Sequence, residues 1–243
     1  MSNKEKIIVA LDVETAKEAR EIIAELRGEV GAFKIGLQLF TAAGASFVRE
    51  TVEDGHKIFL DLKFHDIPNT VSKAAVEAAR LGVWMFNVHA VGGAEMMRRT
   101  SEAVGEFCEK ENLEKPRIIG VTVLTSANRE VLNEVGIEGE PDAQVLRLAR
   151  LAADCGLDGV VASPLEVKLI RRNVENKGFL IVTPGIRGGN SATFDDQKRV
   201  TTASEALLAG ANFLVVGRPI VRAENRVLAV RRILEETANV ENF

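Results

Sequence analysis

The segment at residues 61–70 reads DLKFHDIPNT and brings three charged residues and a histidine together within six positions. It continues the run KIFL, an apolar stretch typical of a buried strand. Asp61 and Lys63 stand two residues apart, so in a strand their side chains share one face. Leu62 and Phe64 then point the opposite way, toward a covering layer. The segment therefore predicts a carboxylate and an ammonium side by side at the end of a strand.

Charged side chains also end or interrupt neighbouring apolar runs. Asp12 closes the run at residues 7–12, and Lys34 lies within the run at 32–36. A purely structural ion pair of Asp61 and Lys63 is one alternative, but such a pair stabilises a fold weakly because desolvation offsets most of the attraction. Alternating charges on adjacent strands favour a network that binds a polar ligand.

A metal site is a second alternative for the same cluster. Asp61, His65, Asp66 and His89 have side chains of the types that bind metal ions. Lys63 argues against this, because an ammonium competes with a cation for the same carboxylates. We therefore expect no metal.

The C-terminal third of the chain contains a candidate phosphate-binding site. The run LIVTPG is followed by more than ten residues, IRGGNSATFDDQKR, before the next predicted helix, and such long loops are often lids. Farther on, VVGRPI offers Gly217 for close backbone approach and Arg218 as a forked donor. A solvated arginine at a turn is the simpler reading of Arg218, but its place after a late strand favours phosphate binding.

These residues must be positioned by the apolar runs, each of which is followed by a helical stretch. Thr15 with Glu18 and Thr202 with Glu205 have the spacing of capping boxes at helix starts. Continuous apolar strands that alternate with helices indicate a parallel sheet covered on its faces. There are eight such runs: 7–12, 32–36, 57–64, 85–90, 117–125, 159–163, 180–185 and 213–218.

Eight repeats in 243 residues predict a (β/α)8 TIM barrel, an α/β fold in which residues 1–243 form a single catalytic domain. A doubly wound open sheet is the alternative, disfavoured by the count of eight and by the lack of a glycine-rich turn after the first run. In a barrel, the C-terminal strand ends meet at one mouth, where the charged residues would converge.

The composition excludes several classes of protein. The net charge is −4, with 46% hydrophobic and 27% charged residues, and there is no basic block that would bind nucleic acid. No apolar run has the length of a membrane span, and the N-terminus does not read as a secretory signal. Cys108 and Cys155 fit no metal or redox spacing and are expected to be buried thiols of a cytoplasmic protein.

The combination of IVALD, DLKFHDIPNT, LTS, TPGIR and VVGRPI, in this order, resembles the orotidine 5′-phosphate decarboxylase family, and its bacterial-type subgroup fits best. The stretch LGVWMFNVHA with the following GGAEMM is also similar to this family. GIRGGN stands where the family often has GIRP, which leaves Arg187 in place and affects only the loop. The resemblance implies decarboxylation of orotidine 5′-monophosphate (OMP) to UMP and CO2, the last step of de novo pyrimidine synthesis, without metal or organic cofactor.

The resemblance also implies roles for individual residues. Lys63 is expected to protonate C6 of the pyrimidine, and Asp61 to lie against the substrate carboxylate. Asp66 is expected to reach the site of the other subunit of a homodimer, together with Ile67 and Thr70.

The remaining expected site residues bind the rest of the nucleotide. Lys34 and Asp12 are expected to bind the ribose hydroxyls and to complete the charged array. Thr125 and Ser126 are expected to contact the ribose or the pyrimidine edge. The expected phosphate ligands are Arg187, Gln197, Gly217 and Arg218.

Two other functions stay open at this point. Asp61, Lys63 and Asp66 also have the D-x-K-x-x-D spacing of Mg²⁺-dependent barrels that act on sugar phosphates, although IPNT, TPGIR and LTS argue against that function. The third possibility is a barrel that binds a nucleotide without catalysis.

Overall fold

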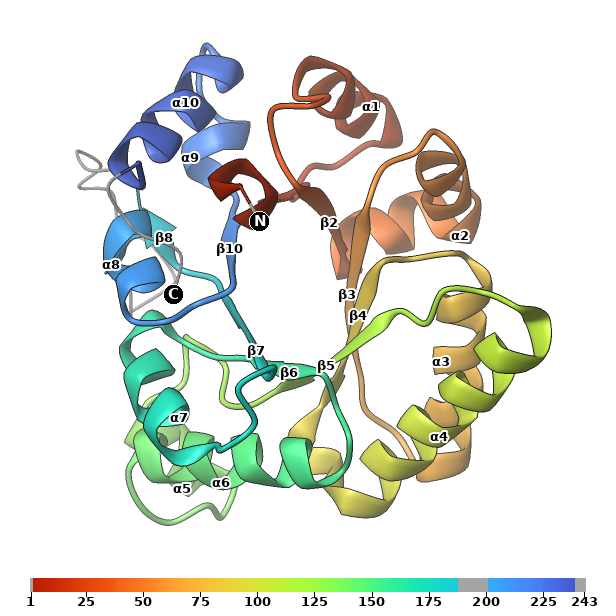
Figure 1. Cartoon of the computed structure of the whole chain (residues 1–243), viewed down its shortest axis with the longest axis vertical. Helices are drawn as coiled ribbons and strands as arrows, with labels where there is room; N and C mark the ends of the chain where they lie inside the picture. The colour runs from red at the N-terminus through yellow and green to blue at the C-terminus, as the bar shows by residue number, and fades with distance from the viewer. Residues whose placement is uncertain (1, 188–200, 239–243) are drawn as a thin grey trace.

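Eight parallel strands close into a barrel in the computed structural model, which describes residues 2–187 and 201–238 (Figure 1). The order around the barrel is β1-β10-β7-β6-β5-β4-β3-β2, and the pairing of β1 with β10 closes it. The predicted TIM barrel is thereby confirmed and the open sheet is excluded. The strands are β1 (Ile7–Ala10), β2 (Ala32–Gly36), β3 (Ile58–Phe64), β4 (Met85–His89), β5 (Arg117–Val121), β6 (Gly159–Val161), β7 (Leu180–Thr183) and β10 (Phe213–Val216).

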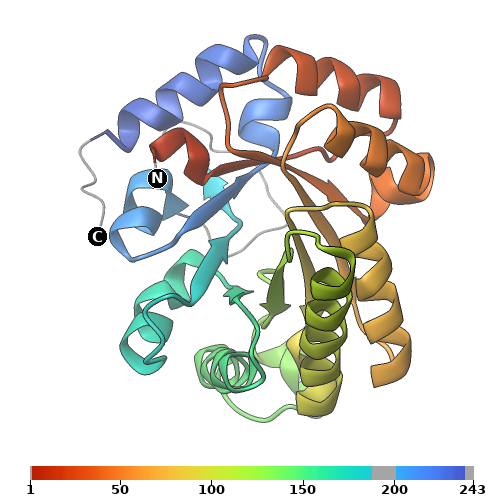
Figure 2. The ribbon, with the colours of Figure 1, turned by 45° about the vertical axis from the view of Figure 1, so that its right-hand side comes forward.

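Helices form a ring around these strands, and Figure 2 shows the same ring turned by 45°. A helix follows almost every strand, as expected for parallel strands that need a crossover. A short parallel ladder joins β8 (Ile186–Arg187) to β9 (Thr201–Thr202). The helices are α1 (Ala16–Glu25), α2 (Leu37–Glu53), α3 (Pro68–Arg80), α4 (Gly93–Glu111), α5 (Arg129–Glu134), α6 (Pro141–Asp154), α7 (Val167–Asn173), α8 (Ala203–Leu208), α9 (Arg218–Val221) and α10 (Arg226–Glu236).

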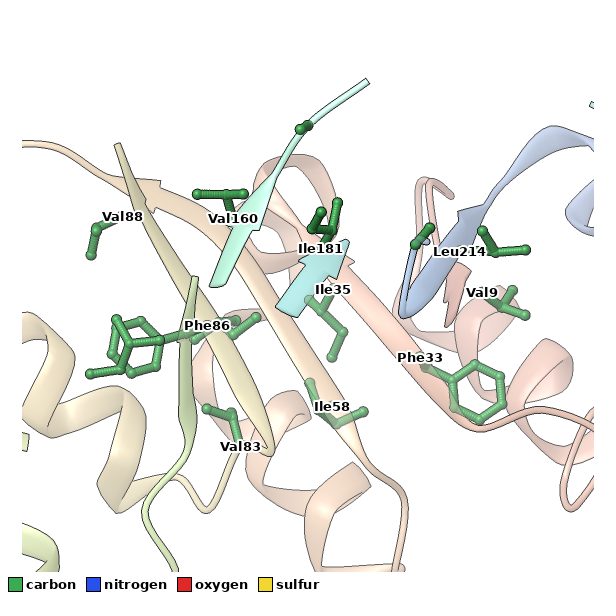
Figure 3. Close-up of a cluster of buried hydrophobic side chains, with 14 of the residues drawn as sticks. Val9, Phe33, Ile35, Ile58, Val83, Phe86, Val88, Val160, Ile181 and Leu214 are labelled. Atoms are coloured by element: carbon green, nitrogen blue, oxygen red, sulfur yellow. The ribbon is translucent and has the colours of Figure 1, made fainter. Parts of the chain in front are cut away.

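Alternate residues of the strands supply two separate layers of core. The outward layer lies between strands and helices and includes Val9, Phe33 and Phe86 (Figure 3). The inward layer fills the barrel, with Phe59 and Phe213 among its largest side chains. This alternation follows from the two-residue period of a strand, and it decides which polar residues enter the barrel.

The predicted helix starts are largely confirmed. At α8, Thr202 accepts a bond from the Glu205 N–H, and the Glu205 carboxylate accepts one from the Thr202 N–H, so the capping box is complete. At α1, Thr15 accepts from the Glu18 N–H at 3.2 Å, but within the described residues the reciprocal half does not form.

Several strands are shorter than the predicted runs, chiefly at their C-terminal ends. The run 7–12 contains a strand that ends at Ala10, and the run 117–125 contains one that ends at Val121. The residues left over, including Asp12 and Thr125, border the mouth of the barrel. Asp12 and Thr125 are therefore loop residues that follow their strands, whereas Lys34, Asp61 and Lys63 lie within β2 and β3.

Candidate active site

Four charged side chains, which lie on or directly after three adjacent strands, form a row at the mouth of the barrel. Lys34 Nζ lies 3.0 Å from Asp12 Oδ1 and 3.4 Å from Asp61 Oδ2. Lys63 Nζ lies 2.6 Å from Asp61 Oδ1. The signs alternate along the row, so every ammonium has a carboxylate partner and Asp61 has an ammonium at each oxygen.

The strand register places these side chains next to one another. Ala10 pairs with Lys34, and Gly36 pairs with Asp61, so the row follows the β1, β2 and β3 ends. Gly36 leaves space for the Lys34 ammonium: a Cβ at this position would lie 2.9 Å from Lys34 Nζ, and the end of that side chain would have to shift. The glycine therefore leaves room for the ammonium between its two carboxylates.

Asp61 and Lys63 meet as predicted, and Leu62 and Phe64 pack against the outward core. The backbone is nevertheless not a regular strand here, because Lys63 has φ 51° and the register to β4 shifts between Leu60 and Phe64. The left-handed conformation costs a residue with a Cβ on the order of 1–2 kcal/mol. The contact between Asp61 and Lys63 therefore does not arise only because the two residues lie on the same face of a regular strand.

Asn87 on β4 bonds to both members of the pair. Its Oδ1 accepts the Lys63 backbone N–H at 2.8 Å, and its Nδ2 donates to Asp61 Oδ1 at 2.7 Å. Asn87 is only 1% exposed. Asn87 lies near the end of β4, and because its two bonds reach a neighbouring strand, sequence spacing alone does not predict them.

Burial and charge act in opposite directions on the pKa values of the row. Burial alone lowers the pKa of Lys34, but Asp61 and Asp12 outweigh it, and the pKa is raised above the ordinary lysine value. Burial likewise raises the pKa of Asp61, whereas Lys34 and Lys63 outweigh it and leave the pKa below the ordinary value. Both groups are therefore held in their charged forms at neutral pH.

The row borders a cavity of about 270 Å³. Its charged rim joins an apolar wall from the far side of the barrel, which includes Val123, Pro184 and Ile186. The sequence did not single out this wall, since apolar residues near strand ends look like ordinary core. The predicted site residues that line the cavity are Asp12, Lys34, Asp61, Lys63, Thr125, Gly217 and Arg218.

Other predicted residues lie away from this cavity. Asp66, Ile67 and Thr70 are exposed between β3 and the first turn of α3, and Ile67 is 66% exposed. Ser126 is exposed beside Thr125 but is not part of the cavity lining.

Two further predicted site residues lie next to or within residues 188–200, which the structure does not describe. The backbone of Arg187 pairs with Thr202 in the β8–β9 ladder. Gln197 lies outside the described residues.

Among the described residues, no group of three or more His, Cys, Asp or Glu side chains could hold a metal ion. The rings of His65 and His89 lie 5.5 Å apart at a tilted angle, so two of the candidate metal ligands contact each other. Burial, with the charges of His65 and Lys63, lowers the pKa of His89. The carboxylate of Asp61 is already occupied by ammonium groups on both oxygens.

Comparison with known proteins gives a family match over most of the chain. The sequence profile of the orotidine 5′-phosphate decarboxylase / HUMPS family matches residues 5–233. The chain belongs to this family.

Its relatives share both sequence and structure. Orotidine 5′-phosphate decarboxylase of Syntrophotalea carbinolica is 54% identical over 235 residues, which cover 97% of this chain and 96% of the relative. The enzyme of the same name from Geobacter sulfurreducens is 50% identical over 96% of both chains. A crystal structure of orotidine 5′-phosphate decarboxylase from Lactobacillus acidophilus superposes with a TM-score of 0.84 at 37% identity, over 95% of this chain and 98% of that one. The resemblance predicted from the motifs is confirmed.

In the described part of the chain, no helix combines the length and apolar character needed to cross a bilayer.

Proposed function

We propose that the charged row at the mouth decarboxylates OMP to UMP, with Lys63 as the proton donor to C6. The reaction itself follows from family membership: the chain is an orotidine-5′-phosphate decarboxylase, a carboxy-lyase that catalyses the last step of de novo pyrimidine synthesis. The observation that carries the residue assignment is the Lys63 ammonium, held 2.6 Å from Asp61 and facing the cavity.

The chemistry explains why an ammonium is needed. Loss of CO2 from C6 leaves an electron pair in the plane of the ring, where the ring's π system cannot delocalise it. Decarboxylases with an organic cofactor pass such electrons to the cofactor. Without that, the protein must stabilise the carbanion electrostatically, and an ammonium aimed at C6 can do so and then donate its proton.

The attraction between the Lys63 ammonium and the carbanion can supply only part of the required rate enhancement. Opposite unit charges about 4 Å apart attract by roughly 4 kcal/mol at an effective dielectric constant of 20. That corresponds to about three powers of ten in rate, whereas very slow reactions need far more. The remainder must come from preorganisation of the row and from binding energy at parts of the substrate that do not react.

Asp61 has two proposed roles. Its carboxylate keeps Lys63 charged and in place, which the 2.6 Å contact supports. It also faces the position proposed for the substrate carboxylate, so the repulsion between them is relieved when neutral CO2 leaves. Lys34 and Asp12, joined at 3.0 Å, are proposed to bind the ribose hydroxyls.

The phosphate is proposed to bind across the barrel from Lys63. Gly217 and Arg218 line the cavity directly after β10, and Arg187 follows β7 in the β8–β9 ladder. Loops after the seventh and eighth strands are frequent phosphate sites in barrels of this type. Gln197 is proposed as a further phosphate ligand and Thr125 as a contact to the ribose or pyrimidine, with Ser126 beside it.

A homodimer with shared sites is also proposed. Asp66 is exposed and does not line the cavity of its own chain, so a catalytic role requires that it act on another subunit. Ile67 and Thr70 are exposed next to it and offer an apolar and a polar contact for the same partner. A cytoplasmic location is proposed because both cysteines, Cys108 and Cys155, are free and buried.

The activity is tested by the loss of OMP absorbance with purified protein, with and without EDTA. We expect turnover by the wild type, no effect of EDTA, and a loss of about a thousandfold or more in kcat for Lys63→Ala. Lys57→Ala, at the opposite end of β3, is the matched control and should keep wild-type activity. Strong inhibition of OMP turnover by EDTA would count against a metal-free mechanism, and tight UMP binding without turnover would favour a non-catalytic barrel.

A further inference from the structure

We propose that Asn87 is a positioning residue, which holds the Lys63 ammonium and the Asp61 carboxylate in their reactive arrangement. The inference rests on the proposed function of Lys63 and Asp61 and adds a residue to it. Asn87 contacts both residues through one amide group, and no other described side chain is recorded with bonds to both the backbone of Lys63 and the carboxylate of Asp61.

The conformation of Lys63 needs an external support. Within the described residues, Lys63 and Asn112 are the two non-glycine residues with positive φ. Asn112 ends α4 as its C-cap, a place where asparagine commonly adopts this conformation. Lys63 has no such local reason, since it lies inside β3.

The support comes from the neighbouring strand. The register between β3 and β4 is interrupted from Leu60 to Phe64, so the Lys63 N–H is not part of the regular ladder. A buried N–H without an acceptor is costly. Asn87 Oδ1 supplies the acceptor at 2.8 Å and thereby stabilises the backbone that aims the Lys63 side chain.

The other end of the same amide fixes Asp61. Asp61 Oδ1 receives Lys63 Nζ at 2.6 Å and Asn87 Nδ2 at 2.7 Å, while Oδ2 faces Lys34 Nζ at 3.4 Å. The carboxylate cannot rotate without losing one of these partners. A neutral amide suits this place, because it offers an acceptor to Lys63 and a donor to Asp61 without adding charge to the row.

Burial makes the arrangement rigid. Asn87 is 1% exposed and lies on the inward face of β4, two residues after the core residue Met85. Water cannot readily replace the two bonds there, so their loss should change the geometry of the reacting groups. Small misplacements of such groups have large effects on rate.

The test compares Asn87→Ala and Asn87→Asp with a matched control, Asn212→Ala. Asn212 Oδ1 also accepts a backbone N–H from a neighbouring strand, that of Ile181 at 2.8 Å, but it precedes β10 at the opposite end of the barrel. Each variant is measured for kcat and KM with OMP. Affinity is measured for UMP and for a UMP analogue with an anionic oxygen at C6, which imitates the carbanion.

For Asn87→Ala we expect kcat to fall by about a hundredfold, with affinity for UMP within about threefold of the wild type. Affinity for the anionic analogue should fall by a factor similar to that in kcat. Asn212→Ala should keep the wild-type ratio of the two affinities. Equal weakening of UMP and the analogue, or a kcat within about threefold of wild type, would overturn the proposal.

Asn87→Asp provides a second measurement if Asn87→Ala does not fold. It keeps the acceptor for Lys63 but places a carboxylate against Asp61, which favours protonation of Asp61. The acid limb of kcat/KM should therefore move to higher pH, and an unchanged limb would contradict the positioning role. Turnover by the wild type tests the proposed function separately, because the Asn87 proposal depends only on ratios between variants and wild type.

Discussion

At Gly36 the lack of a side chain is part of the active site. A Cβ there would lie 2.9 Å from Lys34 Nζ, and that ammonium is held between Asp12 and Asp61. Gly36→Ala should therefore displace Lys34 and lower kcat/KM by about ten- to a hundredfold. The backbone at Gly36 has φ −97°, which alanine accepts, so the melting temperature should change little.

The control for this substitution is Gly105→Ala, in the middle of α4. A Cβ at Gly105 meets no atom within 4 Å, so activity should be unchanged and stability should rise by about 0.5–1 kcal/mol. Wild-type kinetics in Gly36→Ala would show that Lys34 has room to move without loss of function.

Asp61 should remain ionised in mildly acidic solution. Burial raises its pKa, but Lys34 and Lys63 outweigh burial and hold the pKa below the ordinary value. A depressed pKa contributes to the free energy of unfolding above the ordinary pKa of about 3.9, and this contribution is lost as the pH falls through the folded value. Carboxyl ¹³C shifts, assigned with Asp61→Asn, should show Asp61 still mostly ionised at about pH 4. A midpoint above that pH would contradict the charge alternation.

The charged residues of the site could be predicted from the sequence, because residue type and the alternation of faces along a strand depend only on nearby residues. Asp12, Lys34, Asp61 and Lys63 follow from polar residues placed after apolar runs, and they do meet. The left-handed backbone at Lys63 could not be predicted, because its support is a side chain on another strand.

At the scale of elements, α8 begins with a complete capping box, whereas α1 has only half of one. Thr202→Ala removes the acceptor for the Glu205 N–H and the hydroxyl bond to its carboxylate. We expect the melting temperature to fall by about 2–4 °C, with a smaller fall for Thr15→Ala. Thermal unfolding followed by circular dichroism would check the order, and a larger effect at Thr15 would contradict the reading of the two caps.

The strands and helices follow from the spacing of apolar residues and from the capping and turn residues between the apolar runs. Each of the eight apolar runs contains a barrel strand, because a strand buried on both faces has to be apolar throughout. The C-terminal ends could not be predicted, since apolar residues such as Val123 continue past the last ladder bond and line the cavity instead.

At the scale of the whole molecule, the exposed residue Asp66, after β3, bears on whether each active site is built from one chain or from two. Among the described residues, Asp66 Oδ1 accepts the N–H of its own neighbour, Ile67, at 2.6 Å and no other recorded bond, and Asp66 is not part of the lining of the cavity in its own chain. Lys63, three residues earlier, faces that cavity. If two chains exchange these segments across a homodimer, each site uses Lys63 from one chain and Asp66 from the other.

This arrangement predicts complementation between inactive variants. Lys63→Ala and Asp66→Asn should each lose most activity alone, and a re-associated mixture should regain up to about a quarter of wild-type activity, because half of the dimers are hybrids with one intact site each. Each inactive variant taken through the same dissociation and re-association alone serves as the control, since it can form no site with both Lys63 and Asp66 intact. Subunit exchange is verified by mass spectrometry of differently labelled chains. Failure of the inactive pair to recover activity after proven exchange would show that Asp66 does not act across the dimer.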